Sequence, residues 1–396
     1  MMKKLIATFC ICVWTYYTST AQVNIKRNPN PALQYLLINP DPVGGALGFS
    51  GVTQTNSYSA SYNVGSSAFN KVENEINIKF TKVGASLVDD MNLFSIGYQF
   101  KPTKDESDNE KSSRINVGLT YFQHGLVELR STTGIMTGTI NPFDFNIRGS
   151  YSRKLTERFS VGAGFKYLNS RYYVGDLKDL NTAPVTVTTL GALNADIGLY
   201  YETDMATQKK WHKQLGLSIH NIGAKLNYGD NSGRNFQPTL FRLGGHFERN
   251  VGTIDEEDDD SKIGVNIEFM KLLVPTPQIG KDLETITGIG GIFSSWGDAP
   301  NGLSEELSEI WTSFGITYIH KKNLSFRAGI FYDPSSKSDR TILTGGIGVQ
   351  EIELPNRTYV GFDISYRTST GSFSPMTNTF QIGVHYRWNK GLEEMN

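Results

Sequence analysis

The sequence predicts an all-β protein: a transmembrane antiparallel β-barrel of about 14 strands with an N-terminal hatch segment and long extracellular loops. Three observations lead to this prediction. The chain begins with an export signal, it contains no apolar stretch long enough for a membrane-spanning helix, and apolar and polar side chains alternate to its C-terminus. A tilted strand crosses a bilayer with about nine to eleven residues, and several alternating runs have this length.

The N-terminus has the order of a secretory signal peptide. A basic start at residues 3–4, a short apolar run at 5–17 and small residues before Gln22 predict a signal peptide at residues 1–21 that is cleaved after Ala21. Both cysteines, Cys10 and Cys12, lie in this segment and follow large residues. We therefore expect no lipid attachment, and no thiol chemistry in a mature domain of residues 22–396.

Beyond residue 21, no run approaches the roughly 18 apolar residues of a transmembrane helix, so an exported chain is either soluble or a barrel. The formal net charge of -1 argues against a nucleic-acid partner, because such proteins usually carry excess Lys and Arg. Neither property distinguishes a secreted all-β protein from a membrane barrel.

The alternation favours the barrel. Residues 380–388 place Phe, Ile, Val, Tyr and Trp on one face and Gln, Gly, His and Arg on the other. Runs of the same kind recur around residues 115–121, 143–151, 161–167, 195–201, 215–219, 241–247, 263–269, 326–332 and 362–366. A soluble β-sandwich also alternates, but its strands commonly have only about five or six residues.

The connections between these runs are of two kinds. Tight turns are expected at 154–157 and 321–323, and long polar connections at 101–113, 170–191, 249–261 and 271–311. Barrels of this type have short periplasmic turns and long outer loops, so we expect the long connections outside. The acidic run 255–260 lacks the glycine spacing of a calcium loop and is interpreted as a solvated loop.

Both ends of the mature chain depart from the alternation. Residues 22–60 carry four prolines between 29 and 42, which cannot enter a central ladder, so this segment is expected to form a hatch inside the barrel. At the other end, residues 389–396 form a short tail after Trp388, the aromatic residue on which a barrel of this kind would end.

The inward phase of the strands carries charges of both signs, which we expect to pair in a lumenal lattice because an unpaired buried charge is costly. An ion-selective pore is the alternative. The expected lattice residues are Arg148, Lys166, Asp196, Arg242, Glu268, Arg327, Asp363, Arg367 and Arg387.

The sequence shows no catalytic or metal-binding signature. None of the six histidines pairs with another at metal-ligand spacing, and no nucleophile elbow is present. His220, His246 and His385 fall in the inward phase, where a serine partner would be needed for hydrolase chemistry. We expect lattice positions for them, no enzyme activity, no metal and no cofactor.

The connection 271–311 is the main candidate for partner binding. Its prolines prevent strand pairing and stiffen it, Asp298 begins a turn, and Ser304 is expected to cap a short helix with acidic residues in its first turn. The alternative is a lid on the barrel's own mouth. The expected partner-binding residues are Leu272, Leu273, Val274, Pro275, Pro277, Trp296, Asp298, Pro300, Leu303, Glu305, Glu306 and Leu307.

Six stretches, in order along the mature chain, resemble the PorV family of outer-membrane components of the type IX secretion system, within the wider FadL-like barrel group. They are 35–41 (YLLINPD), 151–155 (YSRKL), 221–225 (NIGAK), 240–245 (LFRLGG), 271–277 (KLLVPTP) and 296–307 (WGDAPNGLSEEL). The family's Met-Gly and Trp-Asn-Pro-Ala elements are replaced by ALGF at 46–49 and SYNVG at 61–65.

The resemblance implies a non-enzymatic secretion component in the outer membrane. Such proteins bind the C-terminal signal domain of cargo that leaves the translocon channel and pass it to a surface attachment complex with a sortase-like protease. The implied partners are the translocon channel protein, cargo signal domains, that complex, and outer-membrane lipid and lipopolysaccharide. The FadL-like group also leaves open a channel for small hydrophobic molecules.

Overall fold

The structure, a computed structural model, describes residues 28–85, 90–102, 112–131, 133–174, 186–204, 210–227, 233–251, 261–278, 280–334, 340–355, 358–370 and 378–388. The expected signal peptide, the start of the hatch segment, the acidic run and the tail lie outside these residues. Within them, no helix combines the length and the apolar character needed to cross a bilayer.

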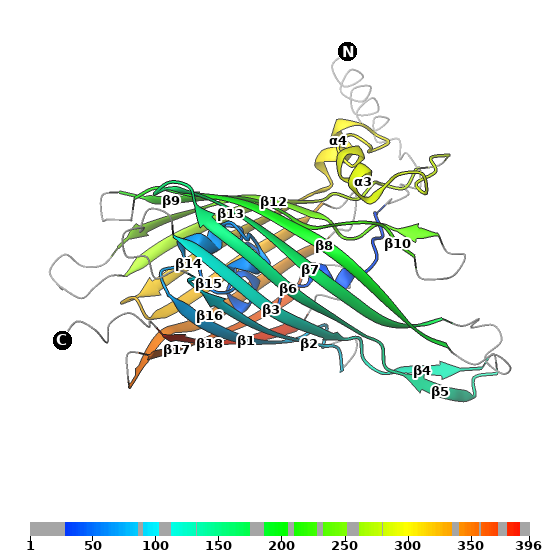
Figure 1. Cartoon of the computed structure of the whole chain (residues 1–396), viewed down its shortest axis with the longest axis horizontal. Helices are drawn as coiled ribbons and strands as arrows, with labels where there is room; N and C mark the ends of the chain where they lie inside the picture. Colours follow the sequence, from blue (N-terminus) through cyan, green and yellow to red (C-terminus); the bar gives the residue numbers. More distant parts are fainter. Residues whose placement is uncertain are drawn as a thin grey trace, which may run out of the picture.

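Fourteen antiparallel strands close into one barrel, which confirms the predicted fold class (Figure 1). Closure comes from pairing of the first strand with the last, from Asn74 opposite Trp388 to Lys82 opposite Phe380. The barrel strands are β1 (Asn74–Lys82), β2 (Asn92–Phe100), β3 (Ser113–Gln123), β6 (Phe143–Lys154), β7 (Phe159–Val174), β8 (Thr186–Glu202), β9 (His212–Gly223), β12 (Leu240–Asn250), β13 (Lys262–Leu272), β14 (Ile310–His320), β15 (Leu324–Asp333), β16 (Arg340–Leu354), β17 (Thr358–Ser369) and β18 (Thr379–Trp388).

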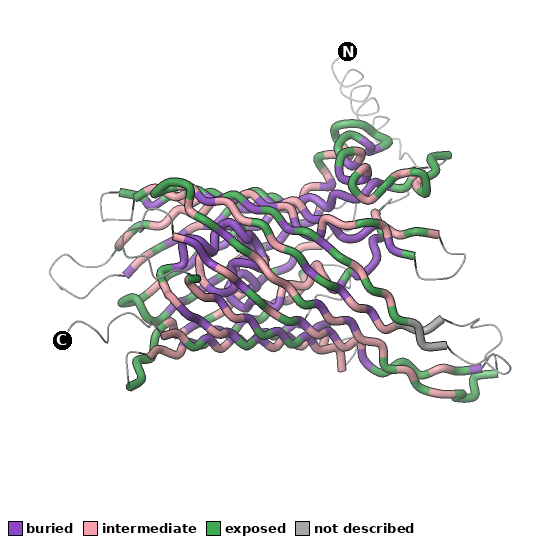
Figure 2. The backbone as a smooth tube through the Cα atoms, in the orientation of Figure 1, coloured by how far each residue is buried: buried purple, intermediate pink, exposed green. Residues whose placement is uncertain are grey.

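The two faces of each strand have opposite environments. In β18, Phe380 and Tyr386 point outward and are 36% and 39% exposed, whereas Gln381 and His385 point inward and are each 1% exposed. Green and purple segments alternate in this way along the barrel tube (Figure 2). The outward residues form an apolar belt of the kind that faces lipid, and the polar residues fill the lumen.

The connections lie at two ends, because successive antiparallel strands alternate in direction. We call the end where β1 begins and β18 ends the turn end; it holds connections 101–112, 155–158, 203–211, 251–261, 321–323 and 355–357. The loop end holds 83–91, 124–142, 175–185, 224–239, 273–309, 334–339 and 370–378. The expectation that 101–113 and 249–261 lie with the other long connections was therefore wrong, because both join strands at the turn end.

Residues 28–73 lie inside the barrel and form the hatch. Their short helices are η1 (Gln34–Leu37), α2 (Pro42–Ala46), η2 (Ser59–Ser61) and η3 (Ser66–Phe69). Asp41 caps α2 by accepting from the backbone amides of Val43 and Gly44, and Pro42 occupies the first turn, where no amide donor is needed. The irregular segment reaches residue 73, further than the predicted 60, because β1 begins only at Asn74.

Small elements lie at the loop end. Two hairpins, β4 (Val127–Arg130) with β5 (Met136–Ile140) and β10 (Leu226–Asn227) with β11 (Arg234–Asn235), lie outside the barrel sheet. The connection between β13 and β14 contains α3 (Gly288–Ser294) and α4 (Leu303–Leu307). Figure 1 shows both helices projecting beside the barrel wall near the ends of β12 and β13. The predicted long connection at 170–191 is shorter, because β7 and β8 extend into it.

Candidate functional site

A cavity of about 710 Å³ opens at the mouth of the loop end. Hatch residues form its floor and inward residues of the strands form its walls. Its apolar lining includes Leu37, Phe49, Phe122, Met270, Trp311 and Phe331. This volume and this mostly apolar lining are typical of sites for small molecules or for apolar groups of a larger partner.

Charged side chains surround the mouth cavity. Two nitrogens of Arg340 donate to Oδ2 of Asp333 at 3.0 and 2.6 Å, while the guanidinium lies 5.6 Å from the Trp311 ring. Arg171 also lines the cavity, and within the described part of the chain it has no ion pair. In the described part of the chain, the cavity therefore combines an apolar body with charged groups at its rim.

The first part of the connection from β13 to β14 closes the mouth. Leu272, Leu273 and Val274 are only 9%, 2% and 3% exposed, and Leu272 and Val274 pack against Phe236. Pro275 is also buried. These four predicted partner-binding residues are therefore inaccessible to a partner, and the lid interpretation describes this stretch.

A buried ion cluster holds the rest of the connection to the wall. The ammonium of Lys271, at the end of β13, lies 2.9 Å from Glu306 and 2.5 Å from Glu309. Asp298 completes a group of three carboxylates whose oxygens lie within 4.8 Å of one another. Carboxylates so arranged resemble a metal site, but here the ammonium of Lys271 lies against two of them and offsets part of their charge.

Asp298 also organises the connection directly. Its Oδ2 accepts from the backbone amide of Thr276 at 2.7 Å, and its carbonyl accepts from the side chain of Gln278. Burial raises the pKa of the Asp298 carboxyl, and the neighbouring Glu309 and Glu306 add to this increase. Asp298 is thus a structural residue rather than a surface contact.

The second part of the connection presents apolar side chains to the outside. Phe293 of α3 and Leu303 of α4 are each 74% exposed, Leu307 is 58% exposed and Trp296 is 50% exposed. The Trp296 ring also makes an edge contact with Phe241 of β12, at 5.6 Å between ring centroids. We call Ile289, Phe293, Trp296, Leu303 and Leu307 the apolar ridge.

The ridge differs in two respects from the sequence expectation. Ser304 does not cap α4, because the helix begins at Leu303 after Gly302, which provides no side-chain cap. Instead, Glu305 reaches back to accept from the amide of Asn301 at 3.0 Å. Phe293 was not among the predicted partner-binding residues. The signal that could have predicted its helix is Thr287, the N-cap residue of α3. Pro277 and Pro300 are exposed beside the ridge.

The inward charges form several local pairs in place of one continuous lattice. Lys166 lies 2.9 Å from Asp196, Arg327 lies 2.8 Å from Asp363, and Arg387 lies 3.3 Å from Glu75. Arg242 pairs with Glu268, which also accepts from hatch amides.

Two inward arginines have no carboxylate partner in the described residues. Arg148 donates to Ser61 of the hatch at 2.7 Å. The guanidinium of Arg367 makes no hydrogen bond with the described residues and lies 4.8 Å from the Phe49 ring.

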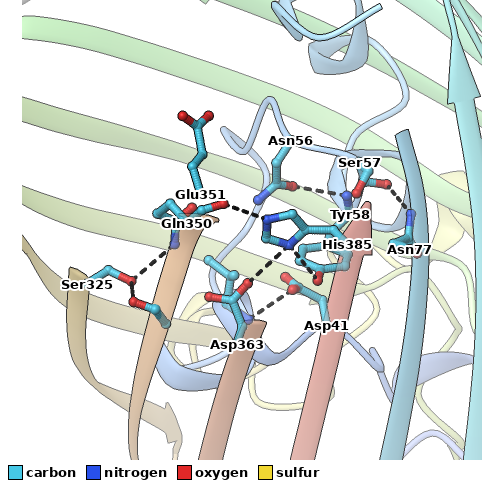
Figure 3. Close-up of polar contacts among 12 residues, drawn as sticks. Asp41, Asn56, Ser57, Tyr58, Asn77, Ser325, Gln350, Glu351, Asp363 and His385 are labelled. Carbon is cyan, nitrogen blue, oxygen red and sulfur yellow. Dashed lines mark hydrogen bonds and ion pairs between the residues drawn. The ribbon is translucent and has the colours of Figure 1, made fainter. Parts of the chain in front are cut away.

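Side chains of the wall and the hatch meet around His385 (Figure 3). Its Nε2 lies 3.0 Å from the carbonyl of Gln350, and its Nδ1 lies 3.4 Å from the hydroxyl of Tyr58 in the hatch. Asp363 of β17 lies 3.7 Å from the same Nδ1. The imidazole is thus held between wall and hatch, and no serine oxygen is bonded to it in the described part of the chain.

A closed barrel with an apolar outer belt and an internal hatch defines an outer-membrane β-barrel protein. The chain belongs to the PorV family: the family model described as "Type IX secretion system protein PorV" matches residues 21–279. The protein is therefore an outer-membrane member of a secretion-system family. A comparison with curated protein sequences finds no match.

Solved structures that resemble this chain include outer-membrane barrels related to FadL. A FadL homologue of Pseudomonas aeruginosa is 9% identical with a TM-score of 0.45, and the match covers 92% of this chain and 100% of that one. The toluene transporter TodX of P. putida is 12% identical with a TM-score of 0.45, and the match covers 87% of this chain and 97% of that one.

Proposed function

We propose that this protein is a non-enzymatic component of type IX secretion that binds the C-terminal signal domain of cargo leaving the translocon. The bound cargo then passes to the surface attachment complex. Family membership supports the secretion role. The single structural observation that carries the binding role is the apolar ridge, where five large apolar side chains beyond the barrel strands are at least half exposed.

The place of the ridge suits a protein partner. It belongs to the loop end, which faces the outside if short turns lie in the periplasm, as is usual for such barrels. Buried aromatic and aliphatic anchors supply most of the affinity at protein interfaces, and the ridge offers two aromatic rings and three aliphatic side chains. Because the Lys271 cluster fixes the connection beneath it, the ridge is presented in one arrangement.

We propose no catalytic role for the inward histidines. His220 Nε2 bonds the carbonyl of Tyr62 in the hatch, and His246 Nδ1 lies 2.9 Å from Asn266. Together with His385, they hold neighbouring wall and hatch groups in place.

The test is a triple variant, Phe293→Ser, Leu303→Ser and Leu307→Ser, expressed in cells that lack the wild-type gene. These changes leave Lys271 and its carboxylates intact, unlike a linker replacement of 296–307. We expect the barrel to assemble normally while cargo accumulates in the periplasm with its signal domain uncleaved. Co-purification of cargo and translocon from native membranes should also fall.

The matched control is Ile135→Ser with Met136→Ser in the connection and strand of the β4–β5 hairpin. These residues are 67% and 51% exposed at the same end of the barrel. Secretion should stay normal in this variant. Normal secretion and co-purification in the triple variant would place the cargo interface elsewhere.

The mouth cavity favours a second candidate function, the passage of a small hydrophobic molecule. Its volume of about 710 Å³ and its apolar lining fit such a ligand. This role predicts that deletion of the gene lowers uptake of a hydrophobic compound while secretion continues. Trapped cargo with unchanged uptake would reject it.

A further inference from the structure

One side of the lumen contains a concentration of polar atoms that make no hydrogen bond. They are buried and belong to four adjacent strands, β1, β2, β3 and β6. Elsewhere in the described wall, such atoms fall on single residues of β8, β9, β12, β15, β17 and β18. We call the eight wall residues of the first group the polar seam: Glu75, Asn77, Lys79, Gln99, Arg114, Asn116, Ser150 and Ser152.

The strand register shows that the seam is continuous. Glu75 is paired with Gln99, Gln99 with Asn116, and Asn116 with Ser150, so these residues form one row across the four strands. The row lies near the turn end, because Glu75 is the second residue of β1. Lys79 lies further along β1, with its ammonium 5.1 Å from the Tyr58 ring of the hatch.

The next strands along the barrel, β7, β8 and β9, are sealed against the hatch. Ser218 of β9 donates to the carbonyl of Tyr62 at 2.6 Å, and Ser160 of β7 donates to the carbonyl of Gly65 at 2.8 Å. At Gly198 of β8, an added Cβ would lie 2.8 Å from the amide nitrogen of Gly65, so hatch and wall backbones touch. On the seam side, Asn77 of β1 donates to the Ser57 carbonyl at 3.4 Å, Asn70 of the hatch donates to Glu75 at 3.3 Å, and Arg114 donates to the Asn70 carbonyl. At Gly97 of β2 and Gly118 of β3, however, the three atoms nearest to an added Cβ belong to the wall and not to the hatch.

Apolar residues close the seam toward the loop end. The rings of Tyr35 in the hatch and Phe122 in β3 stack with centroids 5.8 Å apart and planes 5° apart. Val83, Leu93 and Leu168 surround them in one buried cluster. Because Tyr35 and Phe122 also line the mouth cavity, the stack separates this cavity from the seam.

We infer that water and small inorganic anions enter the polar seam from the turn end, and that the Tyr35–Phe122 stack blocks their passage to the mouth cavity. Buried donors and acceptors without partners are costly, and water is the partner that a small displacement of the hatch would admit. Three cations, Lys79, Arg114 and Arg148, line the seam. They face two carboxylates, Asp41 beside Lys79 and Glu73 beside Arg114, whereas Glu75 is already neutralised by Arg387. The resulting excess of positive charge attracts anions.

Thiol labelling in isolated outer membranes tests access to the seam. Gln99→Cys and Asn116→Cys place a thiol in the seam, and Ser160→Cys and Ser218→Cys are controls on the sealed side with equally buried parents. We expect labelling at the seam positions to be at least about tenfold faster than at the control positions, because local opening of the structure sets the labelling rate. A sulfonate methanethiosulfonate reagent should react faster there than its ammonium analogue. Equal protection at all four positions, or a faster ammonium reagent, would overturn the inference.

Bilayer recordings test the block. The wild type should not conduct, whereas Tyr35→Ala should conduct with anion preference, and adding Lys79→Met should reduce that preference. Phe331→Ala removes an aromatic ring on the far side of the mouth and should stay closed. Heat-modifiable gel mobility establishes that each barrel is folded. A folded Tyr35→Ala barrel that does not conduct, or that prefers cations, would contradict the assignment.

Discussion

The two apolar stretches of the connection between β13 and β14 have opposite environments. Residues 273–276 are buried in the mouth, whereas Phe293 and Leu303 are each 74% exposed. Both stretches are short, apolar and interrupted by proline or glycine, so hydropathy does not distinguish them. What separates them is tertiary contact: the first stretch packs against Phe236 of another connection, whereas the ridge side chains have no such cover in the described part of the chain.

The largest expected effect comes from Lys271→Met. The change leaves Glu306 and Glu309 buried without their shared counter-charge, which typically costs roughly 3–5 kcal/mol. Residues 273–309 should then open locally, so that limited proteolysis cuts this connection while the barrel remains intact. Lys281→Met, at an exposed position of the same connection, is the control and should leave the cleavage pattern unchanged.

A smaller effect is expected when the two stretches are truncated separately. Leu273→Ala removes a side chain that is 2% exposed and should destabilise the connection by about 2–3 kcal/mol, because a rim cavity partly collapses. Leu303→Ala should change stability by no more than about 0.5 kcal/mol. Amide hydrogen exchange of the connection measures both. Equal destabilisation would mean that the ridge is packed as tightly as the lid.

The smallest effect concerns pH. Burial holds the folded-state pKa of Asp298 above the ordinary value of an aspartate. Its contribution to stability is therefore fully present below that ordinary value and is lost as pH rises through the folded-state pKa. Asp298→Asn keeps an acceptor for Thr276 without the charge. The amide hydrogen exchange rates of the connection should therefore be similar in the variant and the wild type at acid pH. Near neutral pH, exchange should be slower in the variant. A faster variant at neutral pH would contradict the burial argument.

The barrel is predictable from the sequence because strand alternation is a local signal. In β18, each inward and outward residue follows from its parity, and the structure places them accordingly. The end at which a connection lies is not local: the position of 101–112 depends on the number of strands before it. The inaccessibility of Leu272 and Val274 depends on contact with Phe236, a residue in another connection.

The candidate sites were predicted less completely, since the hatch is irregular. Periodicity places Arg148 and Arg367 in the lumen, but it does not reveal that their neighbours are hatch groups instead of carboxylates. The polar seam depends on where residues 28–73 touch the wall and where they do not. The structure shows those contacts, and no local pattern in the sequence encodes them.

Closure of the barrel by β1 and β18 has a consequence for assembly. Gln381 of β18 donates to the carbonyl of Asn39 in the hatch at 2.8 Å, across a separation of 342 residues. Contacts this distant in sequence form late, because loop closure over a long chain is slow. We therefore expect the hatch to be in the lumen when the last strand pairs with the first. If the barrel closed first, its lumen would be empty. The hatch precedes the closing strand in the sequence, and this order favours closure around the hatch.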